Sequence, residues 1–175
     1  MARTEIQINQ AANDGATPLY IARQKGRVKV VNVLLARTEI QINQAKNDGC
    51  TPLYIACQND RVKVVNALLE RKEIQINQAD NRGGTPLYMA CQNDHVKVVN
   101  ALLARKEIQI NQATNDGCTP LYIACQVDRV KVVKALLKIK EIDINKQFEG
   151  WTPLGQAIRQ GHTKIAALLQ QHGAK

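Results

Sequence analysis

The sequence contains no serine, and its three histidines, His95, His162 and His172, are scattered along the chain. The absence of serine excludes a serine nucleophile, and scattered histidines do not suggest the ligand clusters of a metal centre. We therefore expect no catalytic residue, no metal site, no cofactor and no small-molecule substrate. The composition argues against an enzyme.

No run of apolar residues approaches the roughly 20 that a membrane-crossing helix needs, because Lys, Asn or Gln interrupts each stretch of Leu and Val. The first six residues also lack the apolar segment of a cleaved secretion signal. Five cysteines without such a signal predict free thiols in a reducing compartment. We expect a cytoplasmic protein that does not contact a membrane.

Aromatic residues are few, with four Tyr, one Trp and one Phe, so no series of rings is available for stacking nucleic acid bases. Charges of both signs are present, and 24 Lys and Arg against 15 Asp and Glu leave a net charge of +9. With 45% hydrophobic and 22% charged residues, the chain has the composition of a folded protein. Its length requires only one domain.

A repeat of 34 residues dominates the sequence. Thr-Pro-Leu-Tyr begins at residues 17, 51, 85 and 119, and the variant Thr-Pro-Leu-Gly begins at 152. Such a period indicates a unit that cannot bury its apolar face alone and therefore stacks on copies of itself. We expect a single domain, 1–175, with a partial lead-in arm at 1–12 and repeats at 13–46, 47–80, 81–114, 115–147 and 148–175.

Residues 81–114 show the content of one unit. The first four residues have turn chemistry, and Thr85 can cap a helix whose first residue is Pro86. A second helix, beginning near Val96, has Val and Leu on one side and Lys and Asn on the other. The alternating stretch 107–111 predicts an extended arm. Each unit is therefore turn, helix, helix and arm, which makes the fold all-α.

This pattern resembles the ankyrin-repeat family, whose Thr-Pro-Leu-His-x-Ala motif is matched here by Thr-Pro-Leu-Tyr-Ile-Ala and whose second-helix signature is matched by Val-Val-Asn-Ala-Leu-Leu. The resemblance covers nearly the whole chain. Tyrosine replaces the usual histidine, Gly-His between the helices survives only as Gly161-His162, and the segment after Leu-Leu is one residue longer. The resemblance implies an ankyrin solenoid of stacked helix-turn-helix units joined by β-hairpin-like turns.

Both ends of the array carry polar residues at positions that are apolar inside it. Arg23 stands where the next three repeats have cysteine, and Lys25 lies nearby. The last repeat is enriched in Gln156, Arg159, Gln160, Lys164, Gln170 and Gln171. Since terminal units of a solenoid need a polar outer face, we expect these side chains to face water and the protein to be a monomer. The chain starts in mid-pattern, because residues 2–10 duplicate 36–44, and we expect a piece of a longer array or a consensus assembly.

The cysteines suggest packing rather than chemistry. Cys57, Cys91 and Cys125 share one position in successive repeats, and stacked helices about 8–10 Å apart cannot bring them to one zinc ion with bonds of about 2.3 Å. We expect them to be buried. Cys50 and Cys118 belong to turns two repeats apart, too far for a disulfide. We expect these two to be exposed.

Three further residue types recur in register. Tyrosine recurs in the first helix, where we expect packing and one hydroxyl hydrogen bond, and asparagine precedes each turn, where we expect hydrogen bonds to the hairpin backbone. Lysine recurs on the outer side of the second helix, where a solvated face is the favoured interpretation and weak nucleic-acid binding the alternative. The residues are Tyr20, Tyr54, Tyr88 and Tyr122; Asn43, Asn77, Asn111 and Asn145; Lys29, Lys63, Lys97, Lys131 and Lys164.

The resemblance implies non-catalytic binding of a partner protein by the concave face, which is made of turn tips and the exposed side of the first helix. Carried over by position, the candidate residues are Asn47, Asp48, Cys50, Gln58, Asn59, Asn81, Arg82, Gly84, Gln92, Asn93, Asn115, Asp116, Cys118, Gln126 and Val127. Phe148 and Trp151 are also candidates, with packing of the last repeat as the favoured interpretation and an aromatic anchor for the partner as the alternative. The nearly uniform turns keep another interpretation open, a designed or trimmed repeat scaffold without a dedicated partner.

Overall fold

A computed structural model describes residues 7–175, which form ten α-helices in five consecutive pairs. The first and second helices of the pairs are α1 (Pro18–Gln24) and α2 (Val28–Leu35), α3 (Pro52–Gln58) and α4 (Val62–Leu69), α5 (Pro86–Gln92) and α6 (Val96–Leu103), α7 (Pro120–Gln126) and α8 (Val130–Leu136), and α9 (Pro153–Arg159) and α10 (Thr163–Gln171). Within the described residues the β-type pairing is one bridge between Phe148 and Trp151. The all-α solenoid expected from the sequence is confirmed.

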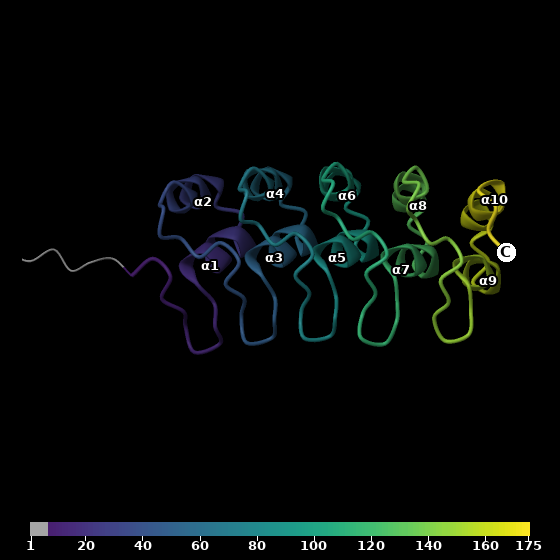
Figure 1. Ribbon diagram of the computed structural model, residues 1–175, viewed down its shortest axis with the longest axis horizontal. Helices are drawn as coiled ribbons and strands as arrows, with labels where there is room; N and C mark the ends of the chain where they lie inside the picture. The colour runs from purple at the N-terminus through teal and green to yellow at the C-terminus, as the bar shows by residue number, and fades with distance from the viewer. Residues whose placement is uncertain (1–6) are drawn as a thin grey trace, which may run out of the picture.

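The pairs are stacked in chain order, so that each first helix packs on the first helix of the next repeat and each second helix on the next second helix. Figure 1 shows two rows of helices, with the second helices (α2, α4, α6, α8 and α10) in the upper row and the first helices (α1, α3, α5, α7 and α9) in the lower, and with the turns projecting below. We call the surface formed by the turn tips and the first helices the turn face. The second helices cover the opposite, outer face.

Each first helix begins directly after a threonine, which caps its amino-terminal end. The threonine hydroxyl oxygen accepts a hydrogen bond of 3.1 Å from the amide three residues later in all five repeats, as Thr51 does from Tyr54. A proline follows at the first helical position, where a missing amide hydrogen costs nothing. The start predicted from the repeated tetrapeptide is confirmed.

The link between the two helices of a pair requires a left-handed residue. Gly26 and Gly161 have φ of 65° and 74° at this position, and Asp60, Asp94 and Asp128 have 52°, 60° and 57°. Glycine adopts this conformation freely, whereas an aspartate is strained in it, although less than most residues. In the three inner repeats, aspartate therefore replaces the glycine of the ankyrin Gly-His pair and keeps the left-handed backbone of the link, at a cost in stability.

The core runs the length of the stack between the two rows of helices. Cys57, Cys91 and Cys125 are each 0% exposed, as expected, and they pack among the Val and Leu side chains of the second helices. Burial raises the pKa of these thiols above the ordinary range. They are therefore held in the protonated form in the folded protein.

The asparagines before the turns connect neighbouring repeats. Asn43, for example, donates to the Glu73 carbonyl at 2.7 Å and accepts from the Gln75 amide at 2.9 Å, and Asn9, Asn77 and Asn111 repeat the pattern. These partners lie 30 and 32 residues later, in the arm of the next repeat. The expectation of a hydrogen bond to the hairpin was therefore wrong, because the arm of the following repeat lies closer.

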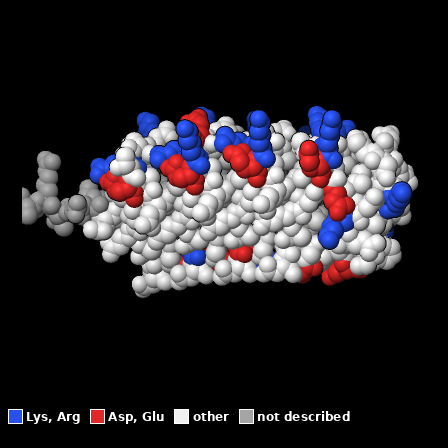
Figure 2. All heavy atoms as spheres, viewed as in Figure 1, with Lys and Arg blue, Asp and Glu red and all other residues white. Residues whose placement is uncertain are grey.

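The lysines of the second helices all lie exposed on the outer face. Figure 2 shows positive and negative side chains gathered together along the edge of the second helices and a broad uncharged region below them. The acidic partners there are in the arms, where Arg37 pairs with Glu39 at 2.6 Å and Arg71 with Glu73 at 2.6 Å. The positive charge of this edge is thus partly neutralised.

The polar residues expected to face water at the two ends of the stack are exposed, except for two, Arg23 and Gln156; the exposed ones are Lys25, Arg159, Gln160, Lys164, Gln170 and Gln171. Arg23 is 0% exposed, and none of its guanidinium nitrogens has a hydrogen-bond partner. Gln156 is also 0% exposed, and its side-chain oxygen accepts from Arg159 at 2.9 and 3.1 Å. Both residues lie on the side of their helix that faces the neighbouring repeat, whereas Ile21 and Ile158, two residues away on the outer side, are 43% and 59% exposed.

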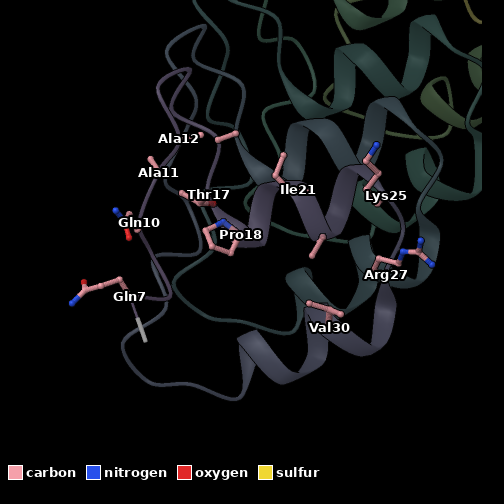
Figure 3. A pocket seen from close by; sticks show the side chains of 12 residues that line it. Gln7, Gln10, Ala11, Ala12, Thr17, Pro18, Ile21, Lys25, Arg27 and Val30 are labelled. Carbon is pink, nitrogen blue, oxygen red and sulfur yellow. The ribbon is translucent and has the colours of Figure 1, made fainter. Parts of the chain in front are cut away.

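The first repeat consequently presents an apolar end. A hollow of about 710 Å³ opens there between α1, α2 and the preceding arm. Figure 3 shows Ile21 and Lys25 along α1 and Val30 on α2 around this space, with Gln7 and Gln10 at its rim. In the inner repeats the residue at the position of Ile21, such as Ile55, is buried against the preceding repeat.

Candidate functional site

The tips of the turns are held together by their own asparagines. The Asn47 side-chain amide donates to the Asn13 carbonyl at 3.1 Å, and Asn81 and Asn115 donate in the same way to the preceding tip at 3.0 Å. These three candidate residues are exposed, but the side-chain amide of each already donates a hydrogen bond to the preceding repeat.

The ends of the first helices place further candidate residues beside the tips. Asn59 and Asn93 donate to the carbonyls of Ile55 and Met89 at 2.8 and 2.9 Å and so close the ends of their helices. Val127 takes the same position in the fourth repeat and packs against the core instead. The last residue of each of these helices is a glutamine, Gln58, Gln92 or Gln126, whose side chain is half-buried along the turn face.

The turn cysteines lie deeper than the sequence suggested. Cys118 is only 3% exposed, so we correct its assignment to the exposed surface, and Cys50 is half-buried. Burial raises the pKa of Cys50 to about 12 and that of Cys118 to about 11. Gly84, the third residue at this position, is also buried. This position is therefore less accessible than the turn tips, where Asn47, Asn81 and Asn115 are exposed.

We call the recurring tyrosines of the first helices, Tyr20, Tyr54, Tyr88 and Tyr122, the tyrosine ladder. Between the first two repeats, a lysine closes the space in front of the ladder tyrosine Tyr20. The Lys46 ammonium lies 5.5 Å from the centroid of the Tyr20 ring and 3.4 Å from one carboxylate oxygen each of Asp14 and Asp48. Tyr20 is 4% exposed as a result. The candidate residue Asp48 is exposed at the turn tip and forms an ion pair with this lysine.

Between the second and third repeats, an aspartate takes the place of that lysine. Asp80 accepts a hydrogen bond of 3.0 Å from the Tyr54 hydroxyl, 3.0 Å from the Arg82 amide and 2.8 Å from the Gly84 amide. Its side chain is 5% exposed, whereas that of Arg82, 3.8 Å away, is 87% exposed. Tyr54 is thereby covered, with 2% of its surface exposed.

Between the third and fourth repeats, the tyrosine is covered less fully and remains half-buried. Thr114 stands at the position of Lys46 and Asp80, is shorter, and turns its hydroxyl to its own turn at Asp116 and the Cys118 amide. A hollow of about 200 Å³ remains in front of Tyr88, lined also by Met89 and Gln92. Tyr88 is the one ladder tyrosine that is not fully buried.

Sequence reasoning placed four residues of this hollow on the candidate surface, namely Arg82, Gly84, Gln92 and Asp116, but it missed Tyr54, Asp80, Tyr88, Met89 and Thr114. The available signal was the departure of Asp80, Gly84, Met89 and Thr114 from the residues at the same positions of other repeats.

The last turn differs from the others. Glu149 and Gly150 both have positive φ, 51° and 78°, which is typical of a two-residue hairpin turn between Phe148 and Trp151. The Phe148 ring packs edge-on against Tyr122 at 5.0 Å and so covers the fourth ladder tyrosine. Trp151 is 45% exposed and lies under the Arg159 guanidinium at 5.4 Å. Of the two aromatic candidates, Trp151 offers the larger exposed surface.

The described part of the chain has neither of two features that would point to other functions. Residues 7–175 bring no three His, Cys, Asp or Glu side chains together as possible metal ligands. Over the same residues, no helix has the length and hydropathy needed to cross a bilayer.

Comparison with protein families gives a consistent result over the length of the chain. The model for ankyrin repeats in three copies matches residues 2–80, 38–114, 73–148 and 110–175. The chain belongs to the ankyrin-repeat family. Ankyrin repeats generally act as protein-protein interaction modules and are typically not enzymes. No match was found among curated proteins.

Proposed function

We propose that this ankyrin-repeat chain is a non-catalytic binding module whose partner protein lies along the turn face. One observation carries the proposal. Residues 81–114 differ from residues 47–80 at six positions, and four of these, Arg82, Gly84, Met89 and Thr114, line the hollow in front of Tyr88. Differences between nearly identical repeats are thus concentrated on one surface, as expected where individual contacts with a partner matter.

Further side chains extend this surface along the stack. Gln58 and Gln126 lie on the first helices to either side of the hollow, and Trp151 lies at the end. Aromatic side chains that combine exposed area with a polar edge are common at interface hot spots. The outer face, by comparison, shows the same lysine in each repeat.

Affinity capture with two matched triple variants tests the proposal. The turn-face variant is Gln58→Ala, Gln126→Ala, Trp151→Ala, and the outer-face control is Lys63→Ala, Lys97→Ala, Lys131→Ala. In a nuclease-treated lysate at physiological salt, we expect a protein that the parent and the control capture and the turn-face variant loses. Circular dichroism must show both variants folded. Loss by the control with retention by the turn-face variant refutes the proposal.

The exposed lysines favour one second candidate function, weak binding of a polyanion by the outer face. All five lie exposed in one register, but the arms behind them carry Glu39, Glu73 and Glu107, whose pKa values are lowered by hydrogen bonds. Binding through several lysines must weaken steeply with added salt because counterions are released. A titration with a DNA duplex that is flat between low and physiological salt excludes this function.

We further propose that the chain is a monomer in a reducing compartment such as the cytoplasm. Five free thiols, most of them buried, support the compartment. Sedimentation that shows a dimer at micromolar concentration contradicts the monomer. If neither the parent nor the outer-face control captures a protein, a repeat scaffold without a dedicated partner becomes the better description.

A further inference from the structure

We infer that the hollow in front of Tyr88 receives a lysine side chain of the partner protein. The inference rests on the proposed function and names the chemistry that the central repeat recognises. It starts from the ladder of four tyrosines, each of which faces the turn of the following repeat.

Three of the four tyrosines are covered by a different side chain of this protein. Lys46 lies over Tyr20, Asp80 accepts from the Tyr54 hydroxyl, and the Phe148 ring packs on Tyr122. These tyrosines are 4%, 2% and 1% exposed. Tyr88 faces Thr114, which is too short to reach across its ring, and its hydroxyl has only a distant contact of 3.9 Å with the Cys118 sulfur. The tyrosine of the third repeat therefore lacks the covering group that its equivalents have.

The first two repeats show which group fits in this position. The Lys46 ammonium lies 5.5 Å from the ring centroid of Tyr20, a distance at which the ring face attracts a cation. The same ammonium is 3.4 Å from Asp48, the aspartate at the tip of its own turn. Around the hollow, Tyr88 and Asp116 occupy the positions of Tyr20 and Asp48. Of the three groups that hold the Lys46 ammonium, the ring and the carboxylate at the tip of its own turn are thus repeated around the hollow, whereas Asp14 is replaced by Arg82.

The charges around the hollow favour a cation over an anion. Asp80 and Asp116 contribute two carboxylates, and Arg82 contributes one guanidinium. The Arg82 side chain is 87% exposed and lies 3.8 Å from Asp80, so it extends into water from the rim. Gly84 stands where the adjacent repeats have cysteine, and no side chain there separates the Asp80 carboxylate from the hollow.

The size of the hollow limits what can enter. About 200 Å³ is below the range of about 300–1,000 Å³ that pockets for drug-sized molecules occupy. One long side chain fits this space. Its methylene groups would lie along Met89 and the Tyr88 ring, and its ammonium would reach Asp116.

A fragment titration observed by NMR tests the inference without the partner. The probe is n-butylammonium chloride, which reproduces the lysine side chain, and sodium butyrate at equal ionic strength is the comparison. We expect butylammonium to shift the Tyr88 ring and the amides of residues 114–118 in a saturable manner in the millimolar range, and butyrate to leave them unchanged. Equal shifts with butyrate, or no shift with butylammonium, overturn the inference.

Four variants sharpen the titration. Thr114→Lys supplies the missing lysine from within the chain, as Lys46 does, and must abolish the shifts. Asp116→Asn is expected to weaken binding about two- to fivefold, and Arg82→Asp, which restores the residue found at Asp14, to strengthen it by a similar factor. Asp14→Asn is the matched control and leaves binding to the hollow unchanged. Undiminished binding in folded Thr114→Lys contradicts the inference.

The same Thr114→Lys variant separates this inference from the proposed function. If the captured protein is lost with the turn-face variant but retained by Thr114→Lys, the turn face binds the partner and the lysine site is wrong. If fragment binding is as expected but no variant affects capture, the hollow is a cation site outside the partner interface, and both statements about the partner are refuted.

Discussion

Replacement of Arg23 should stabilise the protein, because a buried arginine without partners opposes folding. Its guanidinium is 0% exposed, and its Nε, Nη1 and Nη2 atoms all lack a hydrogen-bond acceptor. Removal from water lowers the pKa of this group from 12.5 to about 9. At about 1.4 kcal/mol for each pKa unit, this fall corresponds to roughly 5 kcal/mol as an order of magnitude.

The recovered free energy will be smaller, since a new side chain must fill the space of the old one. Arg23→Met keeps an unbranched side chain without its charge. Even paired buried charges can be replaced by apolar residues with a gain of up to about 4 kcal/mol, and Arg23 has no partner to lose. We expect a gain of about 2–4 kcal/mol in the free energy of unfolding, which for a chain of this size raises the melting temperature by about 4–16 °C. Arg23→Cys, which introduces the residue found in the next three repeats, should also stabilise.

The assay is equilibrium urea unfolding in reducing buffer, followed by circular dichroism at several pH values. Above pH 9 the native parent binds fewer protons at Arg23 than the unfolded chain does, so the free energy of unfolding of the parent must rise relative to that of Arg23→Met. Below pH 9 the difference between the two proteins must be constant. Equal or lower stability of both variants at pH 7, or a difference that does not change up to pH 11, refutes the argument.

Three other changes test the packing and the turns. Ile55→Ala, at a position 6% exposed, should lower the free energy of unfolding by about 2–4 kcal/mol. Ile21→Ala, at the equivalent position, which is 43% exposed, should lower it by less than about 1 kcal/mol. Equal losses in urea unfolding would contradict the packing described for the first repeat. Asp94→Gly should raise the melting temperature by relieving the left-handed backbone at φ of 60°, with a gain of about 0.5–1 kcal/mol, and a loss would show that the carboxylate has another role. Because burial raises the pKa of Cys118 from 9.0 to about 11, its contribution to stability is complete below pH 9 and is lost between pH 9 and 11; a Cys118→Ala variant must show a weaker decline of stability with pH in that interval.

The repeat period predicts much of this structure because its signals are local. Thr51 and Pro52 fix the start of a helix within four residues, and the Val and Leu pattern selects the buried side of the next one. The same local pattern places Cys91 in the core and Lys97 on the outer face. Each of these assignments depends on neighbours within the same unit, which the sequence displays directly.

The features that sequence reasoning missed depend on the adjacent repeat. Whether Arg23 faces water or the interior depends on which side of α1 packs against α3. A shift of two positions along this helix changes a buried side chain, Arg23, to an exposed one, Ile21. The hydrogen bonds of Asn43 go to residues 30 and 32 positions later. Composition and helix-capping residues do not predict these contacts between repeats. The contacts depend on the rotation of each helix about its axis and on the offset between neighbouring repeats.

One position in each repeat decides how the recurring tyrosine of the turn face is covered. The residue at this position is Lys46, Asp80 or Thr114 in consecutive turns, and the tyrosine in front of it is accordingly held by a cation, bonded to a carboxylate or left accessible. The tyrosine itself and the helix that carries it do not change. Since the fold depends on the unchanged residues, substitutions at this position alter what the surface can bind with little effect on the stack. A nearly uniform array can therefore present a distinct site in one repeat, and uniformity of the turns does not by itself argue against a specific partner.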